Sequence, residues 1–230
     1  TARNAWTSAS LARSGAHASD DSLDGEAGLF RALNCQPEVT LFSNGFEIMQ
    51  VFHKPAPACN YAQTGSQAAA RAAQQFQIEA ADIASVIVHS TAAAIAYPGC
   101  NYRGPFERTL QAKMSIQYCV AAALAKGEIA EANYRKLDDP EINRIAQVTT
   151  LVQDDALSAA YPAKQGSEVE VKMRDGQVHR IRMENVAAAD DGLIRDRFRS
   201  VSPRAQAIEA FVDTLENQKE CGALAALLRA

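Results

Sequence analysis

A lysine ahead of a proline-rich turn is the first residue whose surroundings suggest chemistry. Lys54 opens the segment Lys54-Pro55-Ala56-Pro57-Ala58-Cys59, and a helix with a cap at Thr64 or Ser66 is predicted to follow it. An ammonium group and the amides of a helix N-terminus both attract anions, so this turn could bind a carboxylate. The simpler and more common structure is a surface lysine in a loop before a capped helix.

A second polar segment contains Arg103 and, further along, Gln111, Ser115 and Tyr118. The guanidinium of an arginine presents its donors as a fixed fork that suits a carboxylate. The other three residues are spaced to share one face of a predicted helix, where a polar stripe needs partners or a pocket. The alternative is a solvated helix face, or a buried tyrosine that is hydrogen-bonded internally.

The cysteines and histidines give no pattern of their own. Cys59 could be a nucleophile, but the sequence places no base beside it, and a free buried cysteine is far more common. No two of the five cysteines form a C-x-x-C pair, which predicts free thiols in a reducing cytoplasm. The histidines lack the spacing of a helical metal site, so we expect no metal. They are His17, His53, His89 and His179.

The composition excludes several classes of function. The 230 residues are 47% hydrophobic and 22% charged, which is typical of a globular protein and not of a disordered one. A formal net charge of −4 without a basic stripe gives no reason to expect a nucleic-acid partner. Apolar stretches such as Val120–Ala125 are too short to span a membrane, so no membrane partner is expected.

The elements that must position these residues follow from the periodicity of apolar side chains. Two alternating runs joined by Asp175-Gly176 predict a β-hairpin, and Gly127 is expected to end a long helix in the left-handed conformation. The strands are predicted at 46–51, 83–89, 148–152, 167–173 and 178–183. The helices are predicted at 2–13, 26–33, 67–76, 108–125, 130–134, 140–146, 193–200, 203–215 and 222–228.

This order predicts an α+β fold and not a parallel sheet built from βαβ units. We expect a small mixed sheet with a β-hairpin and packed helices, flanked by helices that belong to an all-α domain. Residues 1–45 would be the end of that helical domain, 46–190 the α+β domain, and 191–230 carboxy-terminal helices that return to the helical domain. The chain begins directly in a helix at Ala2, so we expect it to continue a longer protein.

Four segments, in this order, together resemble the MmgE/PrpD family. The first resembles the family's helix and its L-E-G-x-x-G region, and the second its K-P-Y-P-x-C signature. The third is similar to the A-K-F-S-x-x-Y-x-V-A helix, and the fourth to the hairpin and the L-x-x-K-F helix. The segments are residues 2–28, Lys54–Cys59 with Gln67-Ala68-Ala69, Gln111–Ala121, and residues 169–176 with Leu193–Phe198.

The resemblance implies properties that composition cannot show. Members of the family include 2-methylcitrate dehydratase, cis-aconitate decarboxylase and iminodisuccinate epimerase. They work without a metal or organic cofactor, usually as homodimers, with sites between a helical and an α+β domain. Lys54 matches the signature lysine, which is thought to bind or polarise a substrate carboxylate or to shuttle protons. Gln63 stands where the family usually has a histidine, and an amide cannot act as a base.

These observations predict part of a cofactor-independent lyase, a dehydratase or decarboxylase that moves a proton at a carbon α to a carboxylate. The predicted catalytic residue is Lys54, and the predicted substrate-binding residues are Arg103, Gln63, Tyr118 and Cys59. The expected partners are a small di- or tricarboxylate, a second copy of the protein, and an amino-terminal helical half in the same or a separate chain. The alternatives are an epimerase or isomerase, and a non-catalytic module for carboxylate binding or dimerisation.

Overall fold

A computed structural model describes residues 2–36, 47–220 and 222–229, which form two compact units, residues 1–51 and 52–230. In the first unit, α1 spans Ala2–Arg13 and α2 spans Leu29–Ala32, with a 3₁₀ helix at Glu47–Gln50. The strand predicted at 46–51 is therefore wrong where the structure describes it. A strand needs a neighbour to satisfy its backbone, and the four paired strands all lie further along the chain.

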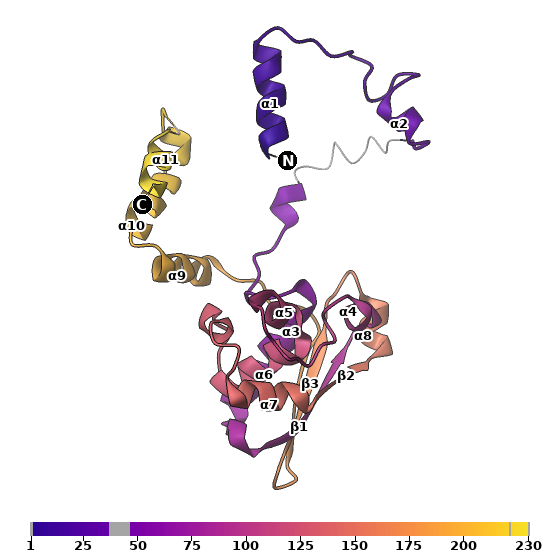
Figure 1. The fold of residues 1–230 in the computed structure, drawn as a ribbon, viewed down its shortest axis with the longest axis vertical. Coiled ribbons are helices and arrows are strands. Elements are labelled where there is room, and N and C mark those ends of the chain that lie inside the picture. The colour runs from indigo at the N-terminus through magenta and orange to yellow at the C-terminus, as the bar shows by residue number, and fades with distance from the viewer. Residues whose placement is uncertain (1, 37–46, 221, 230) are drawn as a thin grey trace. The chain divides into compact units, whose positions relative to one another are not determined.

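The second unit confirms the predicted α+β fold with a small mixed sheet (Figure 1). Its helices are α3 (Gln63–Phe76), α4 (Ala92–Ala96), α5 (Thr109–Met114), α6 (Ile116–Lys126), α7 (Pro140–Gln147), α8 (Asp155–Ala160), α9 (Asp191–Val201), α10 (Ala205–Val212) and α11 (Gly222–Leu228). Short 3₁₀ helices cover Asn60–Ala62, Ala80–Asp82, Glu131–Tyr134 and Leu215–Asn217. The sequence did not predict α4 or α8.

The sheet has the strand order β2-β1-β3-β4. Its strands are β1 (Ile83–Ser90), β2 (Thr149–Gln153), β3 (Ser167–Met173) and β4 (Val178–Met183). The predicted hairpin joins β3 to β4, and Gly176 in its turn has φ +92°. β1 pairs with β2 in parallel, through a crossover that contains α4 to α7. This one parallel pair makes the sheet mixed, as predicted, although the sequence did not show which strands would form it.

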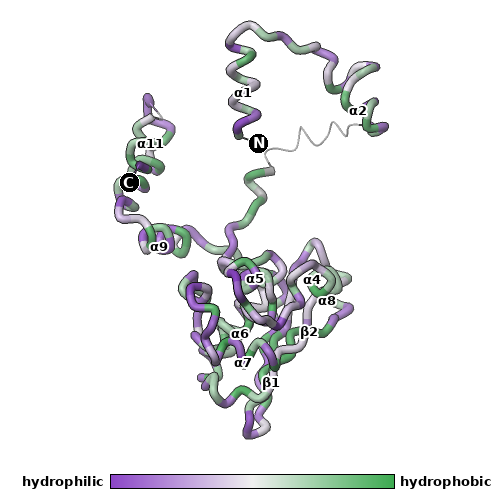
Figure 2. Tube along the Cα trace, viewed as in Figure 1, coloured by the Kyte–Doolittle hydropathy of each residue, from purple (hydrophilic) through white to green (hydrophobic). Residues whose placement is uncertain are grey.

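One face of the sheet is the core of the second unit. The side chains of Val86, Val88, Val169 and Val171 are fully buried on this face, which α3 covers together with α6. Both helices present alanines to each other, so their backbones can approach closely. Figure 2 shows hydrophobic stretches where β1 and β2 run through the unit. The site residues are therefore carried by a well-packed frame.

Two helix predictions need correction. The helix predicted at 108–125 is two helices, because the Ser115 hydroxyl accepts a hydrogen bond from the Tyr118 amide and starts α6 anew. The helix predicted at 67–76 starts at Gln63, so the cap expected at Thr64 or Ser66 is wrong. Both side chains lie inside α3, where the Ser66 hydroxyl donates to the carbonyl of Ala62. Gly127 ends α6 at φ +67°, as predicted.

The carboxy-terminal helices α9 to α11 group with the second unit in this chain. The boundary between the two units falls after Val51. The return of α9 to α11 to a helical domain stays a prediction, as does the assignment of residues 1–45 to the end of such a domain.

Candidate functional site

The Lys54–Cys59 turn is held from inside by the side chain of Gln63, the first residue of α3. Its Oε1 accepts a hydrogen bond from the Ala56 amide at 2.8 Å. Its Nε2 donates to the carbonyls of Ala56, Ala58 and Cys59 at 2.9, 2.9 and 3.1 Å. Gln63 is fully buried, so its amide fixes the shape of the turn. A direct contact of Gln63 with a substrate stays a prediction that these bonds do not favour.

Arg197 of α9 holds the same turn from its outer side. Its guanidinium donates to the carbonyl of Lys54 at 3.1 Å and also to the carbonyl of Pro55. Burial lowers the pKa of Arg197 below its ordinary value, which reflects the cost of removing a charge from water. The amide of Ala189 donates to the carbonyl of His53 at 2.9 Å. Two segments far along the chain therefore fix the backbone on which Lys54 sits.

The Lys54 ammonium is exposed at the surface of this fixed turn. Its Nζ lies 3.4 Å from the carbonyl oxygen of Ala58. Among the residues that the structure describes, no carboxylate forms an ion pair with it. A cation without a counter-charge, on a backbone that is itself held in place, is suited to attract a carboxylate from solution.

Cys59 ties the end of the turn to α5. Its amide donates to the carbonyl of Lys113 at 2.8 Å, and its half-buried thiol lies 3.7 Å from the thiol of Cys100. The pKa of Cys100 is raised to about 12, mainly because its thiol is buried and to a smaller extent because Cys59 lies beside it. Cys35, Cys59, Cys100 and Cys119 are all free thiols, as predicted for these four.

Tyr118 is fully buried inside the second unit. Its hydroxyl donates to the carbonyl of Asn133 at 3.0 Å, and its ring packs against those of Phe106 and Tyr134. Burial is the main reason that the pKa of Tyr118 is raised to about 12. The predicted polar face does not form, because the helix restarts at Ser115. Substrate binding by Tyr118 stays a prediction.

Arg103 is exposed and lies against β2. Its guanidinium donates to the hydroxyl of Thr150 at 3.0 Å, and its backbone carbonyl accepts a hydrogen bond from Gln147. The pocket that it lines, of about 420 Å³, contains none of the other four predicted site residues. Its role in binding a substrate carboxylate is therefore still a prediction.

The structure brings Lys54, Cys59 and Gln63 together at one turn. Among the described residues, no hydrogen bond joins this turn to the side chain of Arg103 or Tyr118. Sequence reasoning missed Arg197 as a residue that holds the turn. The only signal for it was that its helix resembles a family motif, and that resemblance gave no role to the side chain. In the part of the chain that the structure describes, no group of three or more metal-binding side chains could hold a metal ion.

A mixed sheet covered by alanine-rich helices, with an exposed lysine on a braced proline turn, defines an α+β domain with a candidate anion site. Residues 56–198 match the MmgE/PrpD C-terminal domain, so the chain belongs to the MmgE/PrpD family, as its sequence predicted. This family includes dehydratases and related enzymes. Lys54 lies two residues before the matched range. No curated protein matches the chain, and no described helix is long and apolar enough to cross a membrane.

Proposed function

We propose that this chain is part of a cofactor-independent lyase that acts on small di- or tricarboxylic acids in the cytoplasm, as a homodimer. The reaction would be a dehydration or a decarboxylation that passes through proton transfer at a carbon α to a carboxylate. An epimerase would share the proton step but return the proton to the opposite face of the same carbon. The membership of the MmgE/PrpD family supports this class of chemistry.

One observation carries the proposal: the Lys54 ammonium is exposed and has no counter-charge among the described residues, and its turn is held by hydrogen bonds from Gln63 and Arg197. When a base removes an α-proton, the electron pair of the C–H bond moves toward the adjacent carboxylate. A fixed cation beside that carboxylate stabilises the developing charge, and such stabilisation is commonly the largest catalytic contribution. In a dehydration the β-hydroxyl then leaves as water with the aid of a proton.

The base and the group that assists departure are expected from the amino-terminal helical half of the enzyme. Gln63, which replaces the histidine expected from the family pattern, cannot accept a proton at neutral pH. The Tyr118 hydroxyl is buried and already bonded to a carbonyl. The proposal therefore gives this chain the binding of the substrate carboxylate and the stabilisation of charge, and not the removal of the proton.

A non-catalytic carboxylate-binding module is the second candidate. The side chains of Gln63 and Tyr118 are both engaged in internal hydrogen bonds, which favours this candidate. Lys54 then remains as the predicted site residue whose charge is exposed. Such a module would bind small polycarboxylates at Lys54 but would not exchange their α-protons.

Proton NMR in D₂O distinguishes the two candidates. A panel of small di- and tricarboxylates would be incubated with the chain alone and with the complete gene product, and the loss of α-proton signals would be followed. The lyase proposal predicts exchange, and new product signals for at least one acid, with the complete protein. Binding without exchange in either form would contradict it and support the module.

A further inference from the structure

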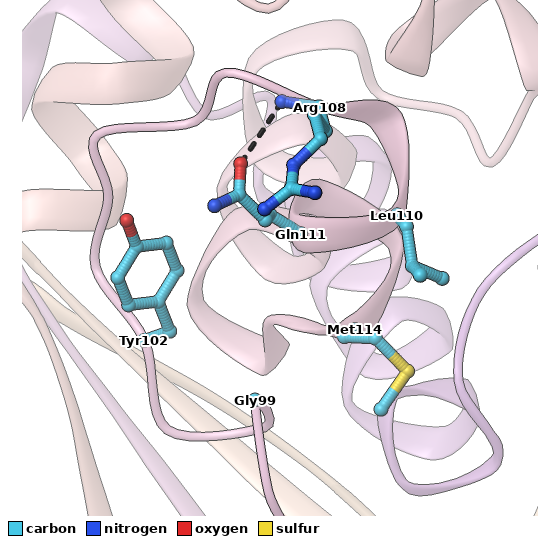
Figure 3. A pocket seen from close by; sticks show the side chains of 6 residues that line it. All are labelled: Gly99, Tyr102, Arg108, Leu110, Gln111 and Met114. Atoms are coloured by element: carbon cyan, nitrogen blue, oxygen red, sulfur yellow. Dashed lines mark hydrogen bonds between the residues drawn. The ribbon is translucent and has the colours of Figure 1, made fainter.

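A second pocket, of about 370 Å³, lies beside α5 and shares no lining residue with the Lys54 turn (Figure 3). Its volume is near the lower end of the range for sites that bind small molecules. Of the residues around this pocket, the sequence singles out Gln111 alone, by its spacing from Ser115 and Tyr118. The pocket is lined by Gly99, Tyr102, Arg108, Leu110, Gln111 and Met114.

The apolar walls of this pocket are held in place by the surrounding structure. The Tyr102 hydroxyl donates to the carbonyl of Pro105 at 2.6 Å, which fixes the ring. Gly99 has φ +84°, and a Cβ at this position would lie 3.4 Å from the Cβ of Met114. Leu110 lines the pocket and is 71% exposed, so its apolar surface is accessible to a ligand. The pocket therefore offers a formed apolar surface to a ligand.

Two side chains that line this pocket, Gln111 and Arg108, can donate hydrogen bonds to a ligand. The Gln111 Oε1 already accepts from the amides of Glu107 and Arg108 at 3.0 and 2.9 Å, which leaves its Nε2 to donate. Figure 3 shows the Arg108 guanidinium directed over the pocket between Gln111 and Leu110. Within the described ranges, no carboxylate forms an ion pair with Arg108.

We propose that this pocket binds a small monocarboxylate with an apolar body. The carboxylate would take two parallel hydrogen bonds from the Arg108 guanidinium and one from Gln111, and charge-assisted bonds of this kind are the strong ones. The apolar body would lie against Tyr102, Leu110 and Met114. A second carboxylate on the ligand would face an apolar wall and lose its hydration, so dicarboxylates bind more weakly. The inference does not depend on the function proposed for Lys54.

Titration of the isotope-labelled chain with hexanoate tests this site, because the amide signals of Gly99 and Met114 report on the pocket. Hexanoate should shift both signals in a saturable manner. Hexanol, which lacks the charge, and succinate, which lacks the apolar body, should each bind at least about tenfold more weakly. Equal binding of hexanol or succinate, or no saturable shift with hexanoate, would overturn the proposal.

Two variants and a matched control assign the effect to the pocket. Arg108→Gln should weaken hexanoate binding about tenfold or more, because it removes the charge but keeps the backbone amide that bonds Gln111. Leu110→Asn should weaken it about fivefold through the loss of apolar contact. Arg71→Gln removes an exposed arginine of α3, and binding should not change. A response of all three variants alike would overturn the assignment.

Lys54 does not line the pocket, so the outcome of this titration does not depend on the outcome of the α-proton exchange experiment.

Discussion

The Gln63 side chain connects to four backbone groups of the Lys54 turn, through one acceptor and three donor contacts. An imidazole has only two nitrogens and could not make all of these bonds at once. At the residue scale, Gln63 therefore holds the turn in shape, at a position where the resemblance to the family implies a titratable histidine.

Gln63→Met keeps the approximate shape of this residue and removes its hydrogen bonds. We expect the free energy of unfolding to fall by about 2 kcal/mol or more, because buried backbone groups of the turn lose their partners. Urea unfolding followed by circular dichroism measures the change. The control is Gln75→Met, an exposed glutamine of α3, which should change the free energy by less than about 0.5 kcal/mol. Equal effects of the two substitutions would contradict the assigned role.

The sequence was sufficient to single out Lys54 and its turn, because lysine, prolines and a following helix are all local signals. It could not show that Gln63 points inward or that Arg197 reaches the turn from 143 residues away in the chain. Those contacts depend on how distant elements pack. The sequence could not show the burial of Tyr118 for the same reason, since that burial follows from the packing of α6 in the core.

At the scale of elements, the ends of helices are where tertiary contacts decide the outcome. The sequence predicts one continuous helix over 108–125, but Ser115 interrupts it. The Ser115 hydroxyl donates to the carbonyl of Tyr102 at 2.5 Å, and the Ile116 amide donates to the carbonyl of Cys100 at 2.9 Å. Both partners lie in the loop before α5. The capping of Tyr118 by Ser115 is local, but the contacts that turn the chain at Ser115 are not. By contrast, the β3–β4 hairpin and the end of α6 rest on local turn chemistry and were predicted correctly.

Gly127→Ala tests the left-handed end of α6. Nothing lies within 4 Å of a Cβ built at this glycine, so the cost should be the backbone conformation at φ +67° alone. We expect the free energy of unfolding to fall by about 1 kcal/mol, measured by urea unfolding. Gly222→Ala is the matched control, because its surroundings are equally open and its φ is not in the left-handed region. That variant should not be destabilised.

Two aspartates that cap helices predict how stability depends on pH. A hydrogen bond from Lys126 is the main cause that lowers the pKa of Asp139, while the amide of Leu157 and then Arg182 lower that of Asp154. Because both pKa values are lower in the folded chain, the stabilisation is complete above about pH 4. It is lost as the pH falls through the folded pKa values.

The double variant Asp139→Asn with Asp154→Asn should therefore lose less stability than the wild type when the pH is lowered through the acidic range. Thermal unfolding at a series of pH values measures this dependence. Asp82→Asn, at an exposed aspartate, should keep the dependence of the wild type. An unchanged pH dependence in the double variant would show that other carboxylates control acid unfolding.

At the scale of the whole molecule, each unit exposes large apolar side chains. In the first unit Trp6 is 74% and Leu11 55% exposed, and in the second Val201 is 68% and Leu228 60% exposed. Single exposed hydrophobic residues are ordinary, but a helix such as α1 with no buried residue is not a stable element by itself. This agrees with the expectation that these helices meet a further helical segment or a second copy.

The chain made alone should therefore self-associate as its concentration rises, which sedimentation velocity measures. Trp6→Gln combined with Leu11→Gln should shift the population toward the monomer, because it removes the most apolar part of α1. A wild-type chain that stays monomeric at high concentration would contradict this prediction.

The central claim is that the Lys54 ammonium stabilises charge on a substrate carboxylate, and α-proton exchange in the complete protein tests it most directly. The exchange rate would be compared for the wild type, Lys54→Met, and Lys136→Met as an exposed-lysine control. We predict that Lys54→Met lowers the rate about a hundredfold or more, while Lys136→Met leaves it unchanged. A Lys54→Met protein that exchanges α-protons at nearly the wild-type rate would contradict the role assigned to this turn.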